Sequence, residues 1–170
     1  MSEAEGAMAE PKTLYERDFA AWSRQQADAL RAAARTGSNQ LLDWENLAEE
    51  IDDLGASQRS AVGSYIMRII QHLVKLEYSP AAEPRKGWRR TIRLARLQLD
   101  KRVDSNPSLK PELGNLVSAE TRRGIEYAIA DLEEHDEIDE VGAQVLRRAR
   151  YTEEQVLGDW FPPEPPAGAK

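Results

Sequence analysis

One segment of the sequence limits the possible folds more than any other: residues 57–78, in which apolar residues return every three or four positions. Its apolar members are Val62, Tyr65, Ile66, Ile69, Ile70, Leu73 and Leu76. This spacing is that of an α-helix, and the band is wider than the single apolar stripe of a surface helix. We therefore expect a helix over this segment that other helices enclose, at the centre of a bundle.

The rest of the chain repeats the same helical spacing, and no segment alternates apolar and polar residues in the manner of a β-strand. Further helices are expected over 14–34, 43–54, 85–104 and 111–135, with a weaker segment over 136–150 and a short helix that begins at 152. Glycine favours a helix end, so Gly55 is expected to end or bend the second helix and Ser57 to cap the next one. Together these segments predict an all-α fold, a compact bundle of five or six helices.

The composition of the chain divides it into three regions. Residues 1–12 are small, polar and acidic, which predicts a disordered leader. Residues 13–161 hold all the helical segments and are expected to form a single helical domain, as is usual for a chain of 170 residues. Residues 162–170 contain the run PPEPP, which cannot continue a helix and predicts a Pro-rich tail.

Cysteine is absent from the sequence, which excludes disulfides, thiolate metal sites and thiol nucleophiles. No stretch approaches the roughly 18 apolar residues of a membrane span, and the first residues lack the features of a secretory signal. These observations predict a cytoplasmic protein that does not enter a membrane. The net charge of −7 disfavours nucleic acid as a partner unless a local basic patch overrides it.

An acidic segment and a histidine suggest metal or acid/base chemistry. Six carboxylates lie between Asp43 and Asp53, with no base among them. Glu45 and Glu49 are one helical turn apart, and His72 is available on the next helix, so these three side chains could bind a divalent cation. The alternative is a solvated acidic face, the more common outcome for an amphipathic helix, with a structural His72 that makes one hydrogen bond. We expect no bound metal or cofactor.

A basic segment suggests contact with phosphates. Residues 85–102 hold eight bases and a single acid. Arg89, Arg93 and Arg96 share one helical face with a tryptophan nearby, which is typical of binding to phosphates and stacked bases. The competing interpretation is that these arginines pair with the acidic helix inside the bundle, and the overall acidity of the chain favours it.

Five motifs follow one another in an order that is typical of one bacterial family. They are LYERDFAAWSRQQADALR, LLDWENLAEEIDDLGASQR, HLVKLEYSP, GWRRTIRLARLQLDKRVDSNPSLKP and YTEEQVLGDWFP. On these motifs, the chain from Leu14 to Pro162 resembles the family catalogued as domain of unknown function 29. The resemblance implies a compact helical fold in a bacterial protein, and it implies no established activity, substrate or cofactor.

Several polar residues stand at positions that match the motifs of this family. Together with Arg89 they form the candidate polar cluster, which consists of Glu49, Glu50, His72, Lys75, Trp88 and Arg89. If Glu49, Glu50 and His72 meet in a pocket, a metal-dependent or acid/base enzyme is favoured. The family resemblance assigns no role to any of them, so they are candidates by their chemistry alone.

We expect a non-catalytic protein-interaction module rather than an enzyme, because no nucleophilic triad or glycine-rich phosphate loop can be assembled from the sequence. Leu94 and Leu97 fall away from the apolar stripe of their helix and would be exposed in a monomer. Their exposure predicts an unknown protein partner or self-association into a homo-oligomer. Nucleic-acid binding through 85–102 and an enzyme built on the candidate polar cluster are the alternatives.

Overall fold

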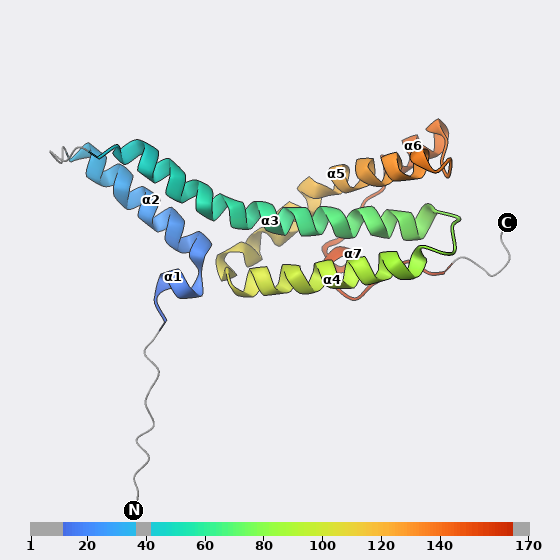
Figure 1. The fold of residues 1–170 in the computed structure, drawn as a ribbon, viewed down its shortest axis with the longest axis horizontal. Helices are drawn as coiled ribbons and strands as arrows, with labels where there is room; N and C mark the ends of the chain where they lie inside the picture. Colours follow the sequence, from blue (N-terminus) through green and yellow to red (C-terminus); the bar gives the residue numbers. More distant parts are fainter. Residues whose placement is uncertain (1–11, 37–41, 165–170) are drawn as a thin grey trace, which may run out of the picture.

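The computed structural model describes residues 12–36 and 42–164, and Figure 1 shows how its helices are arranged. They are α1 (Leu14–Arg17), α2 (Phe19–Arg35), α3 (Trp44–Tyr78), α4 (Arg85–Asp104), the 3-10 helix η1 (Pro107–Glu112), α5 (Leu113–Glu134), α6 (Glu140–Leu146) and α7 (Glu153–Leu157). Within the described ranges there is no β-strand, and five of the seven α-helices have at least seven residues. The prediction of an all-α bundle of five or six helices is confirmed. Most of the predicted leader and tail, 1–11 and 165–170, lies outside the described residues.

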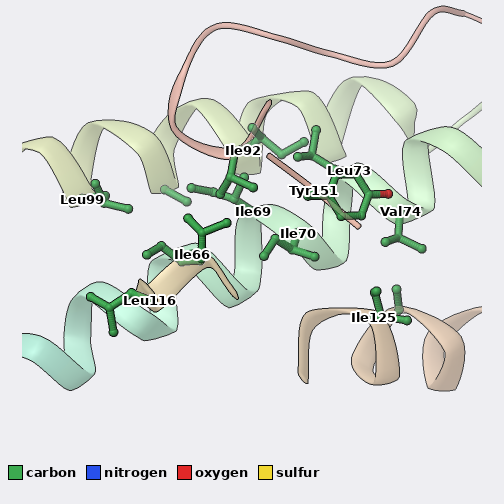
Figure 2. Packing of buried hydrophobic residues seen from close by; sticks show 14 of the residues in the cluster. Ile66, Ile69, Ile70, Leu73, Val74, Ile92, Leu99, Leu116, Ile125 and Tyr151 are labelled. Atoms are coloured by element: carbon green, nitrogen blue, oxygen red, sulfur yellow. The ribbon is translucent and has the colours of Figure 1, made fainter. Parts of the chain in front are cut away.

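The long helix α3 is the centre of the bundle, as its wide apolar band predicted. It packs against α2, α4 and α5. The side chains of its second half that have no exposed surface are Val62, Ile66, Ile69, Ile70, Leu73 and Val74. Figure 2 shows their partners, which include Ile92 and Leu99 of α4 and Leu116 and Ile125 of α5. Full burial of side chains of this size contributes about 1.5–3 kcal/mol each, so this half of α3 holds the bundle together.

Gly55 was predicted to end or bend a helix; it does not end one, because α3 continues without a break through both predicted segments. A side chain at Gly55 would lie 1.9 Å from Ser23 Oγ of α2, so the glycine permits the two helices to approach closely. Ser57 does not cap a new helix; its hydroxyl donates to the carbonyl oxygen of Leu54, 2.6 Å away. Figure 1 shows that α3 changes direction in this region while remaining helical.

The predicted helix over 14–34 is divided into α1 and α2 at Asp18. The carboxylate of Asp18 accepts a hydrogen bond from Ala21 N–H, which begins α2. The same carboxylate accepts hydrogen bonds from the backbone N–H and the hydroxyl of Ser108, at 2.6 and 2.9 Å. Asp18 therefore leaves the helical conformation to join the start of α2 to η1, a contact between segments 90 residues apart that helical spacing does not report.

The second half of the chain follows the predicted order with shifted boundaries. Helix α4 has the predicted start and end. Helix α5 begins at Leu113, after the short 3-10 helix η1 that contains Pro111. In the weak segment 136–150 only α6 is helical. Asp136 has a φ angle of 54°, which is outside the helical range and separates α5 from α6. No helix in the described residues is long and apolar enough to cross a membrane.

Candidate functional site

The candidate polar cluster does not assemble, because Glu49, Glu50 and His72 all belong to the single helix α3. With a rise of about 1.5 Å per residue, the separation from Glu50 to His72 along the helix is about 30 Å. The same separation keeps Glu45 and Glu49 from sharing a metal ion with His72. Among residues 12–36 and 42–164, no three acidic or histidine side chains form a group that could hold a metal ion. Glu49 and Glu50 therefore do not meet His72, and the structure does not form the pocket that the alternative of an enzyme site on these residues requires.

His72 makes a local contact in the second half of α3. Its Nδ1–H donates to the carbonyl oxygen of Arg68, with 3.0 Å between the two atoms. Burial lowers the pKa of His72 below its ordinary value of 6.5, and the nearby positive charge of Lys75 acts in the same direction. The neutral imidazole is therefore favoured at pH 7, in agreement with the structural interpretation of this residue.

Lys75 and Trp88 are the two members of the candidate polar cluster that do meet. The Lys75 ammonium lies 4.9 Å from the centroid of the Trp88 ring. It also forms an ion pair with Asp131 at 2.7 Å, and the Gln71 amide donates to the same carboxylate at 2.9 Å. Because these residues come from α3, α4 and α5, the contact joins the three helices at one end of the bundle. It is a packing contact between helices, with its lysine side chain only 14% exposed.

The three arginines of the predicted phosphate-binding face surround a phenylalanine from the C-terminal segment. The guanidinium carbons of Arg89, Arg93 and Arg96 lie 5.0, 5.6 and 5.0 Å from the centroid of the Phe161 ring. Arg89 also forms an ion pair with Glu164 at 3.3 Å. The segment that follows α7 therefore covers this face of α4, and the arginines bind protein groups there.

Arg96 is buried, which corrects the prediction that it is open to a nucleic acid. Its guanidinium donates to the carbonyl oxygens of Val156, Gln155 and Trp160, at 3.0, 2.8 and 2.8 Å. Burial lowers the pKa of Arg96 below its ordinary value, while the carboxylates of Asp159 and Asp100 oppose that shift. A side chain with three carbonyl partners is fixed in place, so Arg96 holds the end of α7 and the chain after it against α4.

A stripe of charged and apolar side chains faces solvent on α4 next to this arginine face. We call it the basic stripe; its members are Arg90, Leu94, Leu97 and Lys101, spaced by four, three and four residues. All four are exposed, and the exposed fractions of Leu94 and Leu97 are 50% and 62%. The expectation that these two leucines point away from the packed face of α4 is thus confirmed for a single copy of the chain.

A second stripe lies on the first half of α3. We call it the acidic stripe; its members are Asp43, Leu47, Glu50 and Leu54, again spaced by four, three and four residues. The exposed fractions of Leu47 and Leu54 are 40% and 52%, so two large apolar side chains of this helix face solvent. The neighbouring α2 is rich in alanine and covers Ala48 fully, but it leaves these two leucines half uncovered.

A third feature, which the sequence reasoning missed, is a pocket between α5 and the chain that joins α6 to α7. Its volume is about 550 Å³, and it is lined by Ser118, Thr121, Arg122, Ile125, Glu126, Arg147, Arg150 and Tyr151. The sequence feature that points to this pocket is the arginine-rich run RRAR at 147–150. It draws less attention than the longer basic run of α4 in a chain that is acidic overall. We call this the arginine pocket.

The fold and these surfaces define a class of protein. It is an all-α protein built around one long central helix. Some charged side chains of the protein join helices, and others lie in stripes on its surface. The particular family is also clear. The profile of DUF29, a domain of unknown function, matches residues 14–161, and the chain belongs to this family. The resemblance seen in the sequence motifs is confirmed.

A solved structure has the same fold. It is the crystal structure of an alpha-helical protein of unknown function from Rhodospirillum rubrum ATCC 11170. The two chains are 25% identical with a TM-score of 0.62, and the match covers 90% of this chain and 100% of that chain. No curated protein matches the chain. The comparisons therefore support the architecture, and any function has to be argued from the surfaces described above.

Proposed function

We propose that this protein is a non-catalytic interaction module that binds a second copy of itself, the acidic stripe of one copy packing on the basic stripe of the other. The observation that carries the proposal is the match between the two stripes. Both are exposed, both place two leucines in the same helical spacing, and their charges have opposite sign. Two helices with such stripes can bury their leucines against each other while the flanking charges pair.

Three of the four charged members of the stripes are available for a partner, whereas the fourth, Asp43, caps α3 and accepts hydrogen bonds from Asn46. Glu50, Arg90 and Lys101 form no ion pair with any of the residues that the structure describes, whereas many other charged side chains are paired within the chain. Exposed ion pairs contribute little affinity, typically below about 1 kcal/mol each. The leucines therefore supply most of the attraction. The charges determine that an acidic stripe binds a basic stripe rather than another acidic one.

The acidic stripe is also accessible to a second molecule. Figure 1 shows that α2 and the first half of α3 form an arm that projects beyond α4 and α5. The other face of this half of α3 packs on α2, so the stripe points away from the bundle. Two copies related by a twofold axis would make the contact between stripes twice, which closes a dimer.

Exchange of charges between the stripes tests the proposal. The Glu50→Lys, Asp53→Lys double variant replaces Glu50 of the acidic stripe and the exposed Asp53 beside it by bases, and it leaves Asp43 to cap α3. The Arg90→Glu, Lys101→Glu double variant makes the basic stripe acidic. We expect each variant alone to be monomeric by light scattering after size exclusion, because like charges face each other. An equimolar mixture should recover the mass of the wild-type dimer, since each acidic stripe again meets a basic one.

A matched control keeps the charge change and moves it elsewhere. Glu133→Lys, Glu134→Lys alters two exposed residues at the end of α5 by the same total charge and should leave the wild-type dimer intact. A wild-type chain that is monomeric at high concentration overturns the proposal. So does a mixture of the two charge variants that stays monomeric while the control variant is dimeric.

A further inference from the structure

We infer that the arginine pocket binds a small organic molecule that carries a phosphate monoester. The volume of about 550 Å³ is in the range of small-molecule sites in proteins, which is about 300–1,000 Å³. Three arginine side chains line it together with one glutamate, so its wall is positive in a chain whose net charge is −7. A positive cleft in an acidic protein attracts anions locally, because low-dielectric walls focus the field.

The three arginines differ in how far the protein already uses them. Arg147 forms ion pairs with Glu126 at 3.3 Å and with Glu140 at 3.5 Å. Arg150 uses one nitrogen to donate to the carbonyl oxygens of Ala149 and Arg147, which leaves its other N–H groups to point elsewhere. Arg122 makes no hydrogen bond or ion pair with the described residues. Arg122 and Arg150 therefore provide the free donors, and Arg147 is held in place beside them.

The hydroxyl groups of the pocket restrict the ligand further. Thr121 donates to the carbonyl oxygen of Val117 at 2.7 Å, and Ser118 donates to that of Gly114 at 3.0 Å. Their protons are thus already used, so the donors that face an anion come from the guanidinium groups. A phosphate monoester has three acceptor oxygens and a charge near −2 at pH 7, which matches several guanidinium donors better than a single carboxylate does.

The floor of the pocket is apolar and fixed, which suits the organic part of the ligand. Ile125 is buried beneath the pocket, and Tyr151 donates its hydroxyl to Glu77 Oε2 at 2.9 Å. Burial and the Glu77 carboxylate raise the pKa of Tyr151 far above its usual range, so the ring stays neutral and adds no negative charge. This pocket lies apart from both stripes in sequence, and the inference does not depend on self-association.

Calorimetric titration of the full chain with phenyl phosphate tests the inference. We expect saturable binding that weakens as salt is raised, and a loss of about tenfold in affinity for Arg122→Gln and for Arg150→Gln. Arg148→Gln is the matched control: it removes the same charge from the same loop, but Arg148 does not line the pocket. Arg122 makes no contact that the fold needs, so its variant should also keep the thermal unfolding temperature of the wild type.

Four outcomes overturn the inference. The first two are an absence of phenyl phosphate binding to the wild type and an equal loss of binding in the Arg148→Gln control. The third is benzoate binding as tightly as phenyl phosphate, which would assign the pocket to carboxylates. The fourth is inorganic phosphate binding as tightly as phenyl phosphate, because the apolar floor would then have no part in recognition and the ligand need not be organic.

Discussion

At the scale of single residues, Arg93 and Arg96 show why the sequence could not assign roles within the basic helix. They stand three positions apart on α4 and belong to the same run of bases. Arg93 is exposed, whereas only 7% of Arg96 is exposed and its guanidinium has three carbonyl partners. The difference arises from residues 155–161, some 60 positions later in the chain. Helical spacing correctly predicts that Arg93 and Arg96 share one face of α4, but it does not show which distant segment covers that face.

Replacing each of these arginines by lysine separates the two roles. Lysine keeps the charge but has one nitrogen in place of the planar fork, so it cannot reach all three carbonyls that Arg96 serves from Nε and Nη2. We expect Arg96→Lys to lower the free energy of unfolding by about 2 kcal/mol, because buried carbonyl groups lose their partners. Arg93→Lys should change it by less than about 0.5 kcal/mol, as is usual for an exposed residue. Urea denaturation of both variants measures this, and equal losses would contradict the assigned role of Arg96.

At the scale of secondary structure, the glycines explain both a wrong boundary and the close packing of α3. A rule that takes glycine as a helix end predicted that Gly55 ends or bends the helix, yet the approach of α2 requires a residue without a side chain there. Gly124 on α5 plays the same part on another side of α3, where an added Cβ would lie 2.8 Å from Ile70 Cβ and 2.9 Å from the carbonyl oxygen of Met67. Glycine at a helix crossing and glycine at a helix end look alike in one sequence.

Alanine substitution distinguishes a glycine at a crossing from one that has no packing role. We expect Gly124→Ala to lower the free energy of unfolding by about 1–3 kcal/mol, because α3 and α5 must move apart. Gly87 lies in the first turns of α4 with nothing within 4 Å of its missing side chain. Gly87→Ala should therefore raise the free energy of unfolding by about 0.5–1 kcal/mol, through helix propensity alone. Denaturant titrations in which both variants shift in the same direction would contradict this account.

At the scale of the whole molecule, the sequence predicted the helices and their enclosed centre, because apolar spacing is a local property. It did not predict which charged groups meet. The candidate polar cluster failed because one continuous α3 separates Glu50 from His72, and the arginine pocket was missed because its walls come from segments about 25 residues apart. Only one of the two stripes could be predicted from the sequence, because the exposure of Leu94 and Leu97 was expected and that of Leu47 and Leu54 was not.

The same distribution of burial predicts two levels of stability within the molecule. Among the residues that the structure describes, the largest side chains with less than 2% exposure lie at Val62 or beyond, whereas the buried residues of α2 are Ala20, Ser23 and Ala27. Few apolar contacts allow an arm to open locally without unfolding the rest. We therefore expect the amides of α2 and of residues 44–56 to exchange hydrogen with solvent at least about tenfold faster than those of residues 62–76. Uniform protection along α3 would contradict this picture.

Hydrogen exchange at two protein concentrations connects this difference to the proposed dimer. A contact between the stripes orders the arm of each copy, so raising the concentration should slow exchange over 44–56 and leave 62–76 unchanged. The Glu50→Lys, Asp53→Lys variant should lose this dependence on concentration while keeping the fast exchange of the arm, since both mutated residues are exposed. Local opening of the arm occurs in a single copy, whereas the slowing of exchange requires a second copy. If the arm exchanges quickly at every concentration, the predicted difference in stability still holds, but the second copy does not bind the arm.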